Sequence, residues 1–151
     1  MRLFRSVTLL LILLFGASTD LFCADQFVVV LDAGHGGKDP GAVNGKAQEK
    51  NINLNVALKV GKLIEENCKD VKVIYTRKSD TFIELSKRAD IANKADADLF
   101  ISIHTNSATN KSAYGAETFL LGVEENRTSA NFNVAIAENK AILYESDYET
   151  T

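Results

Sequence analysis

The sequence predicts one α/β domain with a largely parallel, open β-sheet and helices on both faces. Apolar runs at 27–31, 71–75 and 99–103 alternate with two segments of helical periodicity, and this order is typical of parallel βαβ units. The runs are nearly continuous, as expected for strands that are covered on both faces. A chain of 151 residues that is 46% hydrophobic and 25% charged fits a single globular domain.

The first 24 residues are expected to be a secretory signal peptide, which leaves the domain at 25–151. Arg2 and Arg5 precede a short apolar run and then small residues, and the run is shorter than the about 20 residues that a membrane-spanning helix needs. Cleavage fits after Ser18 or after Ala24, and a retained N-terminal anchor is the alternative. Export would place the mature chain in the periplasm or cell envelope, with no stable membrane span after cleavage.

The first predicted strand, 27–31, leads into a glycine-rich loop at 32–42 that is the centre of the predicted site. Glycine lets the main chain approach a ligand closely, and open α/β sheets bind ligands just past the carboxyl ends of their strands. His35 lies in this loop, and the alternative is a tight turn with an incidental surface histidine. Asp32 is interpreted as a residue that orients a ligand histidine or forms a turn, and Asp39 as a solvated charge.

The rest of the chain predicts further elements from apolar periodicity and β-branched runs. In order these are a loop at 43–48, a helix at 49–67, a strand at 71–75, a helix at 83–94, a strand at 99–103, a strand at 116–121 and a helix at 128–143.

Three potential metal ligands are expected to meet at one edge of the sheet. His35 follows the first strand, His104 follows the third, and Glu49 begins the first helix. Parallel strands direct their carboxyl ends to the same edge, and two histidines with a glutamate make a three-ligand zinc site with an open fourth position. The alternative is an unrelated helix-start glutamate and two loop histidines, because the spacing lacks the compact H-E-x-x-H pattern.

Several motifs together resemble the zinc-dependent N-acetylmuramoyl-L-alanine amidases of the amidase type 3 family. They are LDAGHGG at 31–37, DPGA at 39–42, EK at 49–50, YTR at 75–77, Arg88, Ala92-Asn93 and LFISIHTN at 99–106. The resemblance implies that His35, Glu49 and His104 bind one Zn²⁺ per chain. It also implies hydrolysis of the amide between muramic acid and L-alanine, with peptidoglycan or muropeptides as the partner.

The sequence departs from this family in one respect. Family members use a second glutamate, late in the domain, as general base, and its counterpart is expected beyond Thr151. The catalytic base of this chain is therefore unknown, the domain is expected to be incomplete at its C-terminus, and its sheet should have an exposed edge. The alternative function is a catalytically weak or inactive zinc-containing module that binds peptidoglycan or regulates another protein; the need for a protein activator stays open.

Three further polar residues are candidates for substrate binding. Arg77 and Arg88 suit bidentate recognition of a carboxylate, and the alternative is pairing with Asp80, Asp90 or the loop carboxylates. Asn106, just after the predicted ligand His104, either hydrogen-bonds substrate or caps its loop.

Charge and spacing argue against two other classes of function. The net charge of −3 offers no basic surface for nucleic acid. The spacing of GHGGK at 34–38 matches neither G-x-x-x-x-G-K-[ST] nor G-x-G-x-x-G, so a phosphate-binding loop is not expected.

Overall fold

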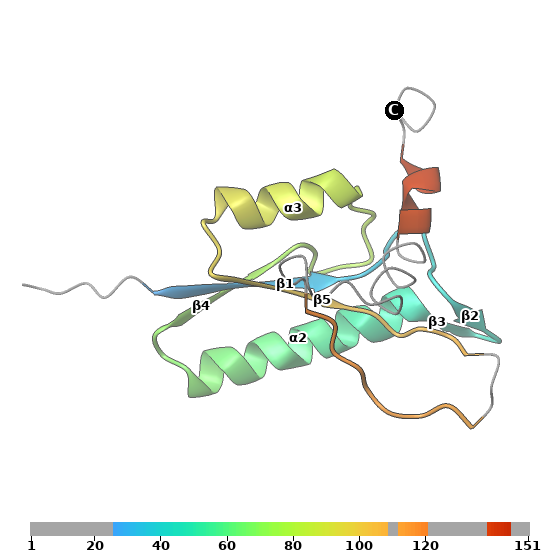
Figure 1. The fold of residues 1–151 in the computed structure, drawn as a ribbon, viewed down its shortest axis with the longest axis horizontal. Coiled ribbons are helices and arrows are strands. Elements are labelled where there is room, and N and C mark those ends of the chain that lie inside the picture. The colour runs from blue at the N-terminus through green and yellow to red at the C-terminus, as the bar shows by residue number, and fades with distance from the viewer. Residues whose placement is uncertain (1–25, 109–111, 121–138, 146–151) are drawn as a thin grey trace, which may run out of the picture.

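The structure is a computed structural model, and it describes residues 26–108, 112–120 and 139–145 (Figure 1). The predicted signal peptide lies outside the described residues, as do residues 128–138 of the predicted last helix. Among the residues that are described, no helix is both long and apolar enough to cross a membrane.

A three-stranded parallel sheet forms the centre of the described fold. Its order is β4 (Val71–Tyr75), β1 (Phe27–Ala33) and β5 (Leu99–Ile103), so the first strand lies in the middle. The central position explains why the first apolar run is the most buried one, with Val30 and Leu31 fully inaccessible.

Two helices cover the opposite faces of this sheet (Figure 1). α2 (Glu49–Asn67) connects β1 to β4, and α3 (Leu85–Lys94) connects β4 to β5. Each helix turns a small residue to the core, Ala57 on α2 and Ala92 on α3, which lets the helices approach the sheet closely. The predicted fold, an open parallel sheet with helices on both faces, is therefore confirmed.

Up to β5, the observed helix and strand boundaries agree closely with those predicted from the sequence, with three differences. β1 continues to Ala33, and α3 begins at Leu85. The segment predicted as a loop at 43–48 forms a small antiparallel hairpin, β2 (Val43–Asn44) and β3 (Ala47–Gln48). Its two-residue turn begins with Gly45 at φ +59°, the conformation that two-residue hairpins require and glycine tolerates.

The predicted strand at 116–121 is wrong over its described part, because residues 116–120 form no strand. A strand needs a hydrogen-bonded neighbour, and in the described sheet β5 pairs with β1 alone. β5 is therefore an edge strand there, and Leu99 and Phe100 on it are 43% and 42% exposed.

The described end of the predicted last helix is a 3₁₀ helix, η2 (Asn139–Tyr144), and not an α-helix. Short 3₁₀ segments are common where a helix is not extended into regular packing. The Glu145 carboxylate, just after η2, accepts a hydrogen bond from the Leu85 main-chain nitrogen at 2.7 Å. This bond caps the start of α3, whose own N-cap residue makes no side-chain cap.

Candidate metal centre

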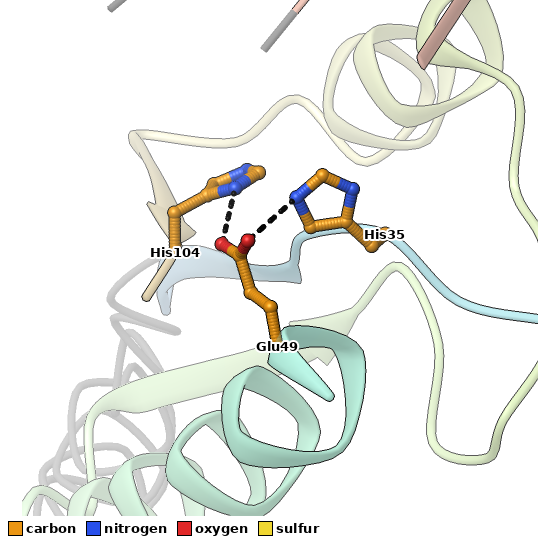
Figure 2. A group of neighbouring side chains, drawn as sticks. All are labelled: His35, Glu49 and His104. Carbon is orange, nitrogen blue, oxygen red and sulfur yellow. Dashed lines mark hydrogen bonds and ion pairs between the residues drawn. The ribbon is translucent and has the colours of Figure 1, made fainter. Parts of the chain in front are cut away.

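His35, Glu49 and His104 meet at the carboxyl edge of the sheet (Figure 2). His35 follows β1, His104 follows β5, and Glu49 is the first residue of α2. His35 Nε2 lies 3.3 Å from Glu49 Oε2, and His104 Nδ1 lies 3.2 Å from Glu49 Oε1. One ligand atom from each residue falls within 4.8 Å of the others, so the three side chains can hold one metal ion.

The chemistry of these donors suits zinc. Each histidine nitrogen lies close to a different oxygen of the Glu49 carboxylate, at 3.3 Å for His35 and 3.2 Å for His104. Two imidazoles and one carboxylate are also a donor set that zinc favours, and three protein ligands leave one position open.

Glu49 is held in the charged form that a metal ligand needs. Its Oε1 accepts a hydrogen bond from the Thr105 main-chain nitrogen at 2.7 Å, and its Oε2 accepts one from that of Ala42 at 2.9 Å. Burial by itself would raise the pKa of Glu49, but hydrogen bonds to His104, His35 and these main-chain groups hold it far below the usual 4.5. The carboxylate is therefore both ionised and fixed in orientation.

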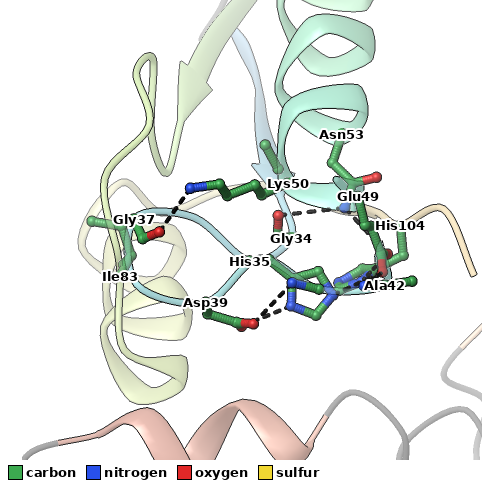
Figure 3. A network of polar contacts seen from close by, with 12 residues as sticks. Gly34, His35, Gly37, Asp39, Ala42, Glu49, Lys50, Asn53, Ile83 and His104 are labelled. Atoms are coloured by element: carbon green, nitrogen blue, oxygen red, sulfur yellow. Dashed lines mark hydrogen bonds and ion pairs between the residues drawn. The ribbon is translucent and has the colours of Figure 1, made fainter. Parts of the chain in front are cut away.

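His35 is oriented by Asp39, which the sequence reasoning interpreted wrongly as a solvated charge. Asp39 is 3% exposed, and its Oδ2 accepts a hydrogen bond from His35 Nδ1 at 2.7 Å (Figure 3). Nε2 is thereby the ring nitrogen that faces Glu49. The local signal was the four-residue spacing across a turn, which the Gly36–Asp39 bridge closes.

His104 approaches the main chain of the glycine-rich loop at Gly34. A Cβ added at Gly34 would overlap the His104 imidazole ring. The Gly34 main-chain nitrogen donates to the Ile103 carbonyl at 3.0 Å, which continues the β1–β5 pairing up to the site. The glycine is thus required for close approach, and the next residue in the sequence is His35, the other histidine of the group.

The two arginines that were candidates for substrate binding are buried: Arg77 is 4% exposed and Arg88 is 6% exposed. Arg88 Nη1 pairs with Asp32, a residue of β1, at 2.7 Å. Asp32 also accepts hydrogen bonds from the Thr76 and Ser102 hydroxyls at 2.6 and 2.8 Å. The expected role of Asp32 in orienting a histidine stays a prediction.

A cleft of about 880 Å³ opens beside the metal-binding group. Its lining includes both histidines, Arg88, Asn106 and Glu117. Arg77 is bonded to main-chain carbonyls at the start of the glycine-rich loop and does not line the cleft. The expected roles of Asn106 and the arginines toward a substrate stay predictions. The position of Glu117 on this lining was not anticipated, since the sequence placed it on a strand.

Comparison with known proteins identifies the family of this chain. The family model of N-acetylmuramoyl-L-alanine amidase, Amidase_3, matches residues 29–147. AmiA of Escherichia coli K12, an N-acetylmuramoyl-L-alanine amidase, is 47% identical over 96 residues, which are 62% of this chain and 32% of AmiA. The chain spans about half, or less, of the curated relatives that it matches.

Solved structures agree with this match. The catalytic domain of CwlV, an N-acetylmuramoyl-L-alanine amidase from Bacillus (Paenibacillus) polymyxa var. colistinus, is 46% identical with a TM-score of 0.54, over 57% of this chain and 49% of that one. An N-acetylmuramoyl-L-alanine amidase from Clostridium difficile 630 is 35% identical with a TM-score of 0.55, over 60% and 50% of the two chains. Because the family model covers most of the sequence and these structures share its fold, the chain belongs to the amidase type 3 family of N-acetylmuramoyl-L-alanine amidases.

Proposed function

We propose that this protein hydrolyses the amide bond between N-acetylmuramic acid and L-alanine in peptidoglycan, using one Zn²⁺ held by His35, Glu49 and His104. The observation that carries the proposal is the group of two histidines and one carboxylate, whose ligand atoms lie within 4.8 Å of one another beside a cleft of about 880 Å³. Membership of the amidase type 3 family supports both the metal and the substrate.

Different residues of the proposed site bind the metal, orient its ligands and contact the substrate. Zinc, when bound, would supply a Lewis acid that polarises the scissile carbonyl and lowers the pKa of a coordinated water. Asp39 keeps His35 Nε2 directed at the site, and main-chain donors fix Glu49. Asn106 lines the cleft and is exposed, so its amide is placed to hydrogen-bond the peptide part of the substrate.

The substrate also bears on where the protein acts. Peptidoglycan lies in the cell envelope, and the basic and apolar N-terminal sequence has the features of an export signal. We infer that the mature chain acts in the periplasm or elsewhere in the envelope. Detection of the processed chain in that compartment would support this inference.

A second candidate function is a zinc-containing module that binds peptidoglycan without turnover. One observation favours it: in the described residues the metal-binding group contains a single carboxylate, Glu49, which is already held by its neighbours. A hydrolase needs a second group to accept a proton, and loss of a general base costs ~10²–10⁴ in rate.

The zinc content and activity of the purified chain test both candidates. We would compare the wild type with His35→Ala, His104→Ala and, as a surface control on α2, Lys59→Ala. Activity is the release of a free L-alanine amino group from defined muropeptides.

Three outcomes are distinguishable. One zinc per chain, lost in both histidine variants and accompanied by product, supports the amidase. Zinc without product but with retention on insoluble peptidoglycan supports the binding module. A folded wild type that takes up no zinc overturns the metal site and both candidates.

A further inference from the structure

We propose that Arg77 and Arg88 are positioning residues that clamp the main chain around His35 and thereby set the geometry of the metal-binding group. This inference rests on the proposed zinc site. It assigns to the two arginines a role in holding the loop in place of the expected contact with substrate.

The two guanidinium groups bind three consecutive main-chain carbonyls at the carboxyl end of β1, where the chain leaves the strand. Ala33 accepts hydrogen bonds from both, Arg77 Nε at 2.8 Å and Arg88 Nη1 at 3.0 Å. Gly34 accepts from Arg77 Nη2 at 2.8 Å, and His35 accepts from Arg88 Nη2 at 3.0 Å. The chain leaves the sheet here, and a buried carbonyl without a donor is destabilising. The arginine side chains therefore donate the hydrogen bonds that a neighbouring strand no longer provides.

His35 occupies a backbone conformation that needs outside support. Its φ is +60°, in the left-handed region that non-glycine residues rarely adopt. Such residues persist where the surroundings over-determine them. The Arg88 bond to the His35 carbonyl fixes its main chain, and the Asp39 bond to its ring fixes its side chain.

Arg77 connects the chain segments that carry two different ligands. Its Nη2 donates to the Gly34 carbonyl at 2.8 Å and to the Lys50 carbonyl at 2.9 Å. Gly34 directly precedes His35, and Lys50 directly follows Glu49. One nitrogen atom therefore sets the distance between the main chain at the His35 position and the start of α2.

Arg88 is itself fixed by an ion pair with Asp32, which is in turn bonded to residues on or directly after the two strands that flank β1. Its pairing with Asp32 at 2.7 Å is buried, with side-chain exposures of 7% and 5%. Asp32 is held by hydroxyls from Thr76, which follows β4, and Ser102 on β5. Through Arg88, the His35 loop is therefore connected to α3 and to both outer strands of the sheet.

Only a guanidinium group can make this set of contacts. Its planar fork presents donors in several fixed directions, whereas a lysine ammonium is a compact charge that cannot span the same carbonyls. Both arginines are nearly inaccessible, so solvent cannot replace the missing bonds. Arginine-to-lysine changes keep the charge and remove the clamp.

The test compares Arg77→Lys and Arg88→Lys with Asp98→Ala in the full 151-residue chain. Asp98→Ala is the control, because it removes a side-chain hydrogen bond to the main chain of β1 at Val28, at the opposite end of the strand from the His35 loop. Zinc affinity is measured by competition with a chelator, site geometry by the visible absorption of bound Co²⁺, and stability by urea unfolding of the metal-free chain.

We expect each lysine variant to bind zinc about 10- to 100-fold more weakly, the usual effect of losing a supporting contact behind a metal ligand. The Co²⁺ spectrum at saturation should change as well, which loss of global stability alone would not cause. Asp98→Ala should lower stability, while its zinc affinity stays within about twofold of wild type.

Failure of this inference is separable from failure of the zinc site. No zinc binding by the wild type overturns the site itself. Wild-type affinity and an unchanged Co²⁺ spectrum in folded lysine variants overturn the clamp alone.

Amide hydrogen exchange of the metal-free wild type provides a measurement that needs no variant. The Gly34 and Gly36 amides, bonded to Ile103 and Asp39, should be protected before metal is added, because the arginines hold the loop. Protection that appears only with zinc would overturn the clamp.

Discussion

His35 Nδ1 lies 2.7 Å from the Asp39 carboxylate, and both side chains are nearly inaccessible to solvent. Carboxylate partners of this kind fix the orientation of a ligand histidine and raise its basicity. The bond also closes a turn, since Asp39 Oδ1 accepts from the Gly41 main-chain nitrogen at 3.0 Å. The carboxylate thus joins the His35 ring to the main chain of the loop that carries it.

Removing the Asp39 carboxylate should weaken metal binding. For Asp39→Ala we expect zinc affinity to fall about 10- to 100-fold, measured by chelator competition. Asp39→Asn should lose less, because its amide oxygen can still accept from Nδ1. Asp90→Ala, on the exposed side of α3, is the control and should match wild type. Equal affinities for Asp39→Ala and wild type would show that the bond does not orient the ligand.

Adding a methyl group at Gly34 should displace His104. A Cβ there overlaps the imidazole ring, so Gly34→Ala should weaken zinc binding at least about 10-fold in a chain that still folds. Gly45→Ala is the control, because it meets no atom within 4 Å and has only the cost of its left-handed φ of +59°. That control should lose about 1 kcal/mol of stability and no zinc affinity. Unchanged zinc binding in Gly34→Ala would contradict the close packing.

Loss of the Asp32 carboxylate should strongly destabilise the fold. Asp32→Ala leaves Arg88 buried without its charge partner, and breaking a buried pair in this way costs about 3–5 kcal/mol. The measurement is urea unfolding of the metal-free chain. Asp98→Ala removes an exposed carboxylate that accepts one bond from the Val28 nitrogen, and it should cost about 1 kcal/mol. Similar losses in the two variants would mean that the buried network contributes little.

Stability should depend on pH in opposite directions without and with zinc. Burial lowers the pKa of His35, but its hydrogen bonds to Glu49 and Asp39 outweigh this and raise the pKa above the usual 6.5. The stability contributed by protonated His35 is therefore complete below 6.5 and disappears as pH rises through the raised folded-state value. Zinc requires the neutral ring, so stabilisation by zinc should grow over the same rise in pH.

Urea unfolding in chelator and in excess zinc, between about pH 5.5 and 8.5, measures both trends. His35→Gln is the reference that isolates the contribution of this residue. Its difference from the wild type in chelator should shrink as pH rises. A difference that stays constant across the range would show that His35 is not the group responsible.

The elements that the sequence predicted well are those with strong local patterns. The bounds of the 49–67 helix and of the strands at 71–75 and 99–103 agree with the structure. The strand predicted at 116–121 is wrong over residues 116–120, because a strand depends on a pairing neighbour that the local pattern does not reveal. The hairpin at 43–48 had a usable signal that was not applied. Gly45 is the first residue of the two-residue turn between the apolar-polar pairs 43–44 and 47–48.

The order of strands and helices can be predicted from the sequence, and this order brings His35, Glu49 and His104 together. Parallel strands direct their carboxyl ends to one edge of the sheet, so the topology alone places these three residues, which are far apart in the chain, near one another. The groups that surround them depend on the tertiary packing. The bonds from Arg77 and Arg88 to the His35 loop join segments more than 40 residues apart, and such pairings depend on how the helices pack against the sheet. Hydrogen-bond partners at that range are set by three-dimensional distance, which no local pattern encodes.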